Sequence, residues 1–476
     1  MATKKIIFNE WLPDQPANSG AVIDAKNVYP VSIGYQPFPS TSDYSGAATE
    51  NLNSLFVTKF ANDVQAFAGS ATKIFKLNNT SLALEDVSGA TYGGTSNWKF
   101  SQFGNACLAV NNSSVVQKWT IGSSTSFSDV SGSPVAKFIT TVRDFVVCGN
   151  LDGGTNANKI SWSDINDYTD WVPGSTSQSD SQVLPDGGNI TGLTGGEFGL
   201  VFLEKAITRI QYIGSPLFFQ VDTISRGLGC LDGNSIAQYG GISFFLSDDG
   251  FYSCDGQNVL GIGQEKVDRF FFNDCDLNKL DSMSAAVDPI KKLVVWNYAN
   301  VGGSRSILIY NWQIKKWSRA DSTATVVGNL ATVGVTLEGL TSTLGYTDID
   351  TMPASLDSRL FIGGKFLFAG AKDTKLVTFT GSVFEPSITT TDIEVGYNSV
   401  INLLRPQIDN GSATVEVASR RELDDDVLFG SPVVTTEEGR ANLRSGGRYH
   451  RIRVSPTGSW TTCMAIDVDI MPQGNR

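Results

Sequence analysis

Short alternations of hydrophobic and polar positions, rather than helical periods, run through most of this 476-residue chain. Stretches rich in Val, Ile, Phe, Tyr and Trp are separated by Gly, Asp, Asn and Ser, the pattern of short strands joined by tight turns. Long segments of Ala, Leu, Glu and Lys at helical spacing are missing. The sequence therefore predicts an all-β protein in which helix makes up well below about a fifth of the chain.

An internal repeat indicates the type of β fold. The Asp-Val-Ser-Gly sequence of residues 86–89 recurs at residues 129–132, which is 43 positions later. Strand-like segments end in the aromatic residues Phe75, Trp119 and Trp162, at spacings of 44 and 43 residues. This period is that of a four-stranded propeller blade. We predict a β-propeller, with six blades favoured and seven possible.

The same three aromatic residues are the predicted anchors of the blade cores. If the repeat is aligned correctly, Phe75, Trp119 and Trp162 occupy related positions in successive blades and are largely buried. Large aromatic side chains bring much apolar area to packing between blades.

Changes in composition and in the hydrophobic pattern divide the chain into three parts. Residues 1–45 contain Pro-rich segments that do not suit central strands, and we expect an extended N-terminal arm. Residues 46–387 carry the repeat and form the predicted propeller. Residues 388–476 alternate strictly in several segments, which predicts a small antiparallel β domain. We expect the arm and this domain to lie close together and to dock neighbouring proteins.

Two segments depart from the strand pattern. The stretch from Phe270 to Leu280 is the best candidate for a short helix, and residues 334–353 form a long polar loop. Loops of that length are usually functional or mobile.

Charge limits the partners of this chain. It has 48 acidic and 36 basic residues, a net charge of −12, so its general surface does not suit nucleic acid. A basic cluster near the C-terminus is the exception, and we predict that it docks an acidic partner surface. The candidate docking residues are Arg440, Arg444, Arg448, Tyr449, His450, Arg451 and Arg453.

The residues that usually carry metal or nucleophilic chemistry are sparse. His450 is the single histidine, and none of the six cysteines forms a C-x-x-C pair. We therefore expect no metal, no cofactor and no catalytic site, and we interpret the cysteines as free buried thiols. We expect no membrane-spanning segment, because no apolar run reaches the length that a membrane helix needs.

Two motifs leave weaker alternatives open. Residues 161–171 faintly resemble the Asp-box turn of sialidase-type propellers, but local turn hydrogen bonding is the favoured interpretation. The acidic run 424–426 suits a solvated loop better than a calcium site, because no regular ligand spacing surrounds it. No pair of carboxylates is singled out by its spacing as a glycosidase pair.

Three segments together resemble the tail hub, or nozzle, proteins of short-tailed bacteriophages. They are the N-terminal residues 24–39, the turn at residues 161–171, and residues 446–454 with Trp460 and residues 467–469 beyond them. The resemblance implies a six-bladed propeller with a β platform, in a ring of six copies below the portal and head–tail adaptor. It also implies other tail proteins, such as fibre and needle, as partners.

The resemblance further implies a structural role and not an enzymatic one. The protein would belong to the virion tail, would be assembled in the host cytoplasm, and would let double-stranded DNA pass through the ring. Two alternatives are a propeller-type glycan-binding or glycan-cleaving phage protein and a cellular propeller scaffold. A channel through which DNA passes should be lined with few Lys and Arg side chains, because these would bind the phosphates. The net charge of −12 per chain agrees with such a lining.

Overall fold

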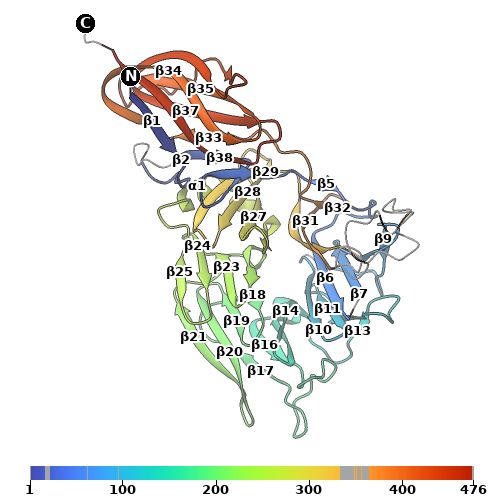
Figure 1. Ribbon diagram of the computed structural model, residues 1–476. Coiled ribbons are helices and arrows are strands. Elements are labelled where there is room, and N and C mark those ends of the chain that lie inside the picture. The colour runs from blue at the N-terminus through green and yellow to red at the C-terminus, as the bar shows by residue number, and fades with distance from the viewer. Residues whose placement is uncertain are drawn as a thin grey trace.

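The fold is described from a computed structural model. It describes residues 2–16, 22–61, 63–94, 96–332, 348, 350, 355 and 364–473. Strands account for 54% and helix for 5% of this structure, so the all-β prediction is confirmed. The protein is a six-bladed β-propeller joined to a large mixed sheet (Figure 1).

Each of the six separate blades is a sheet of four strands. Five of them run consecutively along the chain as antiparallel meanders. They comprise β6 (Ser54–Phe60), β7 (Asp63–Gly69), β8 (Ile74–Leu77) and β9 (Leu84–Asp86); β10 (Lys99–Phe103), β11 (Ala106–Val110), β12 (Gln117–Thr120) and β13 (Ser128–Asp129); β14 (Ala136–Val142), β15 (Phe145–Leu151), β16 (Asn156–Trp162) and β17 (Asp180–Val183); β18 (Ile190–Thr194), β19 (Gly199–Leu203), β20 (Ala206–Gly214) and β21 (Phe218–Arg226); and β22 (Ala237–Tyr239), β23 (Ile242–Leu246), β24 (Phe251–Cys254) and β25 (Val259–Gly261).

The sixth separate blade is completed by the N-terminal arm. It contains β30 (Val326–Ala331), β31 (Phe366–Lys372) and β32 (Lys375–Thr378). Its outermost strand is β5 (Ser42–Asp43), which pairs antiparallel with β32. The two ends of the propeller sequence are therefore joined by backbone hydrogen bonds, which closes the ring and removes an open sheet edge.

A further four-stranded meander stands in the ring between β22 and β30. It consists of β26 (Ser284–Asp288), β27 (Leu293–Ala299), β28 (Arg305–Asn311) and β29 (Lys316–Ser322), and it belongs to the large mixed sheet. The innermost strand β26 contacts both β22 and β30, and β30 in turn contacts β6. The large sheet thus supplies one sector of the ring, between the blade that begins with β22 and the blade that begins with β30.

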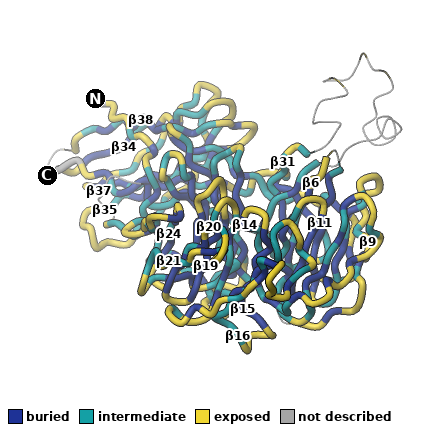
Figure 2. The backbone as a smooth tube through the Cα atoms, turned by 90° about the horizontal axis from the view of Figure 1, so that it is seen from below, coloured by how far each residue is buried: buried dark blue, intermediate teal, exposed yellow. Residues whose placement is uncertain are grey.

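Neighbouring blades are held together by apolar residues on their facing sides. Figure 2 shows buried positions along the strands and exposed positions along the connecting loops. Separate clusters fill the spaces between blades; one of them combines Phe67 of β7 with Trp98 and Trp119 of the next blade. Alternation along each strand explains this packing, because successive side chains of a blade face opposite neighbours.

The C-terminal part of the chain is built on long antiparallel strands. It comprises β33 (Ser387–Thr390), β34 (Ile393–Asp409), β35 (Ser412–Arg420), β36 (Val433–Val434), β37 (Ala441–Thr457) and β38 (Thr462–Pro472). Strand β37 pairs with β33, β34 and β35, and β34 pairs with β38. Register shifts interrupt the pairing of β34 with β37, so these 17-residue strands bend around their own core.

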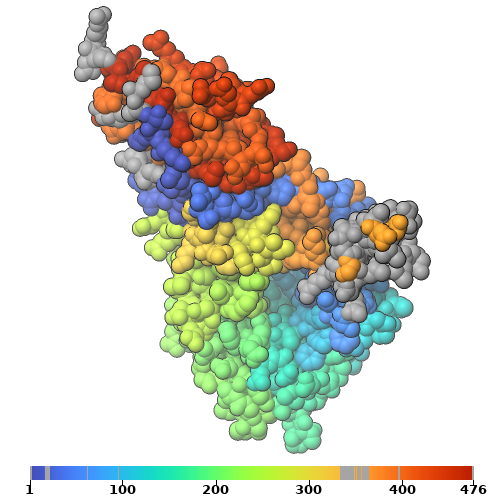
Figure 3. All heavy atoms as spheres, in the orientation of Figure 1, coloured from blue at the N-terminus to red at the C-terminus, as the bar shows by residue number. Residues whose placement is uncertain are grey.

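The N-terminal arm links the propeller to these C-terminal strands. Strand β1 (Ala2–Ile7) pairs with β38, and β2 (Val22–Lys26) lies between β29 and β33. Strands β3 (Val28–Pro30) and β4 (Tyr35–Pro37) continue the same sheet. Figure 3 shows this blue segment between the yellow meander and the red strands.

One hydrophobic core runs through that junction. It includes Trp11 of the arm, Trp296 and Trp317 of the meander, and Ile452 and Val468 of the C-terminal strands. The propeller and the C-terminal strands therefore share a core as well as a sheet, which resists bending between them.

The short helix expected near residues 270–280 is present as α1 (Asp268–Asp274) followed by the 3₁₀ turn η3 (Leu277–Ser282). The expected polar loop at residues 334–353 lies outside the described residues, apart from Asp348 and Asp350. Among the described helices, none is long and apolar enough to cross a membrane.

Candidate functional site

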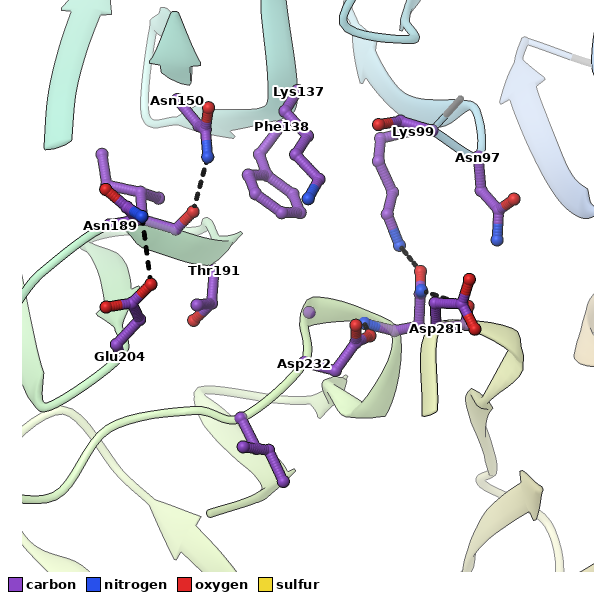
Figure 4. A pocket seen from close by; sticks show the side chains of 15 residues that line it. Asn97, Lys99, Lys137, Phe138, Asn150, Asn189, Thr191, Glu204, Asp232 and Asp281 are labelled. Atoms are coloured by element: carbon purple, nitrogen blue, oxygen red, sulfur yellow. Dashed lines mark hydrogen bonds between the residues drawn. The ribbon is translucent and has the colours of Figure 1, made fainter. Parts of the chain in front are cut away.

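A polar cavity lies where the innermost strands of the propeller begin, and we call it the axial pocket (Figure 4). It has a volume of about 240 Å³. Strands β10, β14 and β18 contribute their first residues, and the loops before β22 and β26 complete the wall. The side chains that matter for its chemistry are Lys99, Lys137, Phe138, Glu204, Asp232 and Asp281.

Lys99 places its ammonium group inside this pocket. Its Nζ atom donates to Oδ1 of Asn234 at 2.7 Å. Burial lowers the pKa of Lys99, an effect that the nearby Asp232 opposes and Lys137 reinforces. An ammonium has three donors, so a single hydrogen bond leaves part of its capacity unused.

Asn234 donates two hydrogen bonds at the turn η2 (Gly233–Ser235), in addition to the one it accepts from Lys99. Its backbone N–H donates to Oδ1 of Asp232 at 2.7 Å, and its Nδ2 donates to the carbonyl of Asp281 at 3.0 Å. Asp232 thereby caps the turn, and the Asn234 side chain is oriented with its oxygen toward Lys99. The loop before β22 is thus a rigid support for the lysine.

Asp232 is the enclosed acid of the pocket. Burial raises its pKa, while the backbone N–H of Asn234 and the positive charges of Lys99 and Lys137 act in the opposite direction. Glu204 and Asp281 are exposed and stand at the rim. Figure 4 shows Glu204 and Asp232 across the cavity from the two lysines, and Asp281 on the same side as Lys99.

Neutral side chains complete the pocket. Asn189 donates from Nδ2 to Oε1 of Glu204 at 3.1 Å, and Asn150 donates from Nδ2 to the carbonyl of Ile190 at 3.0 Å. The Oδ1 atom of Asn150 is buried without a hydrogen-bond partner among the described residues. The ring of Phe138 lies against Lys137, whose Nζ is 5.5 Å from the ring centroid.

Neither lysine has a carboxylate partner at ion-pair distance among the described residues. The described part of the chain also contains no group of three His, Cys, Asp or Glu residues placed to hold a metal ion. The pocket therefore presents ammonium donors, carboxylate acceptors and an aromatic face, which is a surface for binding a small polar molecule.

The comparisons with known proteins identify no family. No family model and no curated protein matches this chain. Among solved structures, the computationally designed Ika8 protein aligns with 70% of this chain and 97% of its own, at 11% sequence identity and a TM-score of 0.35. We draw no functional argument from that similarity.

The arginines predicted to dock a partner lie on or next to β37, and most are paired. Arg440 pairs with Glu438, Arg448 with Glu394, Arg451 with Asp392 and Arg453 with Glu416. Arg444 is exposed and forms no ion pair with another described residue. The cluster is therefore largely neutralised within the chain, and Arg444 is its freest positive charge.

His450 does not lie on the surface, which corrects its selection as a docking residue. It is 0% exposed, and Tyr449 is 7% exposed. The imidazole is held between two serines: its Nε2 lies 2.8 Å from Oγ of Ser399, and its Nδ1 lies 2.7 Å from Oγ of Ser419. Burial lowers the pKa of His450. His450 shares one face of β37 with the buried residues Ile452 and Val454, and this face packs into the domain core.

A buried ion group lies beside this histidine. The carboxylate of Asp392 contacts the guanidinium groups of both Arg420 and Arg451. The side chain of Asp392 is 1% exposed, and those of the two arginines are 9% and 13% exposed. Arg420 also donates from Nη1 to the carbonyls of Leu423 and Asp425, so this guanidinium has backbone as well as carboxylate partners.

The three predicted blade aromatics are buried, with exposures of 1% for Phe75, 2% for Trp119 and 3% for Trp162. Each lies in the third strand of its blade, in β8, β12 and β16. Their register shows that they do not share one repeat position. Phe75 corresponds to Gln117 of the next blade, because Asp86 and Asp129 of the repeated sequence pair with Phe75 and Gln117.

Strand pairing shows a further offset in the third blade. Trp119 is paired with Cys107, the second residue of β11, whereas Trp162 is paired with Val147, the third residue of β15. Trp119 packs toward the preceding blade, whereas Trp162 packs toward the following one, where it meets Phe219. A shift of one residue places a side chain on the opposite face of a sheet.

The weaker motifs are accounted for by local bonding. In the turn at residues 161–171, Asp167 accepts hydrogen bonds from the backbone and side chain of Thr169, and Asp164 accepts from the backbone of Gln178. In the acidic run 424–426, Asp425 accepts from the backbone N–H groups of Arg421 and Glu422. All six cysteines are free and buried.

Sequence reasoning missed the axial pocket entirely. Its residues lie between positions 96 and 281, on five sectors of the ring, and none belongs to a recognisable motif. The one feature of the sequence that could have indicated the pocket is a lysine near the start of two innermost strands, Lys99 in β10 and Lys137 in β14. This feature points to a shared site only when the blades are placed around one axis.

Proposed function

We propose that this protein is a structural component of the tail of a short-tailed bacteriophage, where six copies form a hub or nozzle ring around a channel for DNA. The observation that carries the proposal is the continuous junction between the propeller and the C-terminal strands. A ring subunit must transmit the position of one partner to another without bending, and a shared sheet and core meet that need.

The arm supports this role because it couples both ends of the chain. Strand β1 holds β38, β2 bridges β29 and β33, and β5 closes the propeller. Arg319 of β29 also pairs with Asp24 of β2 at 2.8 Å. A chain fastened in this way presents its docking surfaces at fixed distances, which lowers the conformational cost of assembly.

In this proposal the docking surface includes the exposed Arg444 on β37, and the channel is lined by neutral or acidic side chains. The net charge of −12 supports a lining that does not hold phosphates. The proposed role is mechanical and electrostatic, without an enzymatic step. The head–tail adaptor and the other tail proteins are the proposed partners, and the virion tail is the proposed location.

Native mass spectrometry and negative-stain images of the purified chain test the proposal. Rings of six are expected as the concentration rises or when the head–tail adaptor is added. A chain that stays monomeric at high concentration, alone and with the adaptor, would contradict it. Arg444→Glu should weaken adaptor binding, whereas Arg226→Glu, which changes an exposed arginine of the propeller strand β21, should not.

A DNA titration at low salt tests the channel separately. We expect the assembled ring to bind duplex DNA weakly, because a passage lined with Lys and Arg would add a salt-sensitive grip. Tight duplex binding by the ring would overturn the low-friction channel and favour a protein that holds DNA.

The second candidate function is a propeller that binds a glycan. The axial pocket is the observation that favours it, because amide, carboxylate, ammonium and aromatic groups converge there. The two functions differ in what they require: the first needs a ring, and the second needs a ligand.

A further inference from the structure

The axial pocket holds two positive groups whose charge is not neutralised by direct pairing. Lys99 donates to a neutral amide, and Lys137 lies against the ring of Phe138. Each lysine is partly buried. An ammonium group has three donors, and neither lysine donates to a carboxylate of the described residues, so both keep donors for an anionic group from outside the chain.

The other side of the pocket offers acceptors for hydroxyl groups. Asp232 uses Oδ1 to cap the turn η2 and has no hydrogen bond from another described residue at Oδ2. Glu204 uses Oε1 for Asn189, and its Oε2 is likewise not engaged by another described residue. Carboxylates accept hydrogen bonds at both oxygens, so each acid retains capacity for a ligand.

The aromatic side chain adds a third recognition element. Phe138 is 6% exposed and lines the pocket next to Lys137. Its ring offers an apolar face to the C–H groups of a ligand, while the neighbouring charges hold the polar groups. Ligand sites commonly combine such an apolar surface with a few polar groups that fix the orientation.

We propose that the axial pocket binds one ring of an acidic sugar, with the sugar carboxylate at Lys99 and Lys137 and sugar hydroxyls at Asp232 and Glu204. Figure 4 shows the lysines on one side of the cavity and these acids on the other. The volume of about 240 Å³ is below the range of drug-sized ligands and suits a single ring. This inference is independent of ring assembly.

The balance of charges decides between a carboxylated sugar and a small inorganic anion. The lining contains two lysines and the three acids Glu204, Asp232 and Asp281, so its formal charge is +2 − 3 = −1. Phosphate would bring more negative charge and no C–H face. A sugar acid brings a single negative charge, and its hydroxyl groups donate to the carboxylates. Ligands with one carboxylate and several hydroxyls are therefore preferred.

Isothermal titration with D-glucuronate, D-glucose and inorganic phosphate tests this specificity on the full chain. We expect glucuronate to bind at least tenfold more tightly than glucose or phosphate. Equal binding of phosphate and glucuronate would overturn the sugar assignment and leave a general anion site. Equal binding of glucose and glucuronate would overturn the role of the lysines. No measurable glucuronate binding would overturn the proposal as a whole.

Two variants locate the site. Lys137→Gln should weaken glucuronate binding at least tenfold with an unchanged melting temperature, because this lysine forms no ion pair that the fold requires. Lys118→Gln is the matched control, since Lys118 is also half-buried but lies on β12 outside the pocket. Equal losses in both variants, or no loss in Lys137→Gln, would contradict the assignment.

Asp232→Asn tests the hydroxyl contacts. Its amide retains an acceptor for the turn η2, so the fold should survive. We expect weaker binding of glucuronate and stronger binding of phosphate, because the variant removes a negative charge from the wall. Glucuronate binding that improves together with phosphate binding would show that Asp232 repels the ligand, which contradicts the proposed contact.

Discussion

The C-terminal strands and the axial pocket both enclose charged side chains, but the partners of those side chains differ. In the C-terminal strands, Asp392 contacts two guanidinium groups, and Arg420 also donates to two backbone carbonyls. In the axial pocket, Lys99 has an amide as its hydrogen-bond partner and Lys137 has an aromatic ring.

This difference provides a criterion that distinguishes a charged side chain with a structural role from one that is available to bind a ligand. A buried charge that is fully paired and hydrogen-bonded contributes to one defined arrangement, and removing a partner leaves an uncompensated charge. A charge held only by neutral groups keeps capacity for a ligand. By this criterion the Asp392 group is structural, while Lys99 and Lys137 are available for binding.

The largest effect is expected from Asp392→Asn. This variant leaves Arg420 and Arg451 buried without a carboxylate, and the free energy of unfolding should fall by about 3–5 kcal/mol. Urea denaturation followed by fluorescence measures the change. A loss below about 1 kcal/mol would show that the two arginines are solvated well enough without Asp392, and the comparison would fail.

In the axial pocket we expect a substitution of a charged residue to raise the free energy of unfolding rather than lower it. Lys99→Met removes a charge that has no carboxylate partner, and stability should rise by up to about 1 kcal/mol, a low value because part of the side chain meets solvent. A loss of stability in this variant would indicate that Lys99 is structural after all.

The effect of Lys99→Met should also depend on pH. Burial lowers the pKa of Lys99 in the folded state, whereas the unfolded state keeps a value near 10.4. Between these two values the folded protein has given up the proton, so the stability of the unsubstituted protein rises with pH. The advantage of Lys99→Met is therefore complete below the lowered pKa and shrinks as the pH approaches about 10.4.

A smaller pH effect is expected from His450 at neutral and acidic pH. Burial between Ser399 and Ser419 lowers its pKa, so the unfolded state binds the proton first as the pH falls below about 6.5. Stability should decrease from that pH downward, through the folded pKa. Denaturation midpoints of His450→Gln should depend less on pH in this range than those of the unsubstituted protein; equal slopes would contradict the prediction.

The smallest effect is expected from Glu394→Gln. Glu394 pairs with Arg448 at 2.8 Å, but both side chains are 47% exposed. Exposed ion pairs contribute about 0–1 kcal/mol. This variant is the matched control for Asp392→Asn, because both remove a carboxylate that contacts an arginine of β37. Equal losses in the two variants would show that burial does not distinguish them.

The sequence determined the β architecture because strand alternation and turn residues are local signals. The 43-residue repeat of Asp-Val-Ser-Gly was enough to predict a propeller, and the short helix α1 was also found at its expected place. The burial of Phe75 and Trp119 followed from the same repeat. These features depend on neighbouring residues, which a linear pattern records.

Tertiary structure alone decided the register of Trp162, the burial of His450 and the axial pocket. A one-residue offset between blades cannot be seen in a spacing of 43 or 44 residues, yet it turns a side chain to the opposite face of its sheet. His450 stands between Tyr449 and Arg451, and only the packing of β37 shows that its side chain faces inside.

The axial pocket shows most directly what the linear sequence leaves undecided. Lys99 and Asp232 are separated by 133 positions, and they meet because closure of the ring brings the beginnings of the innermost strands to one end of the axis. The sequence determined the elements through local alternation and turns. The closed ring decided which charges face one another, because their interaction depends on distance in space and not along the chain.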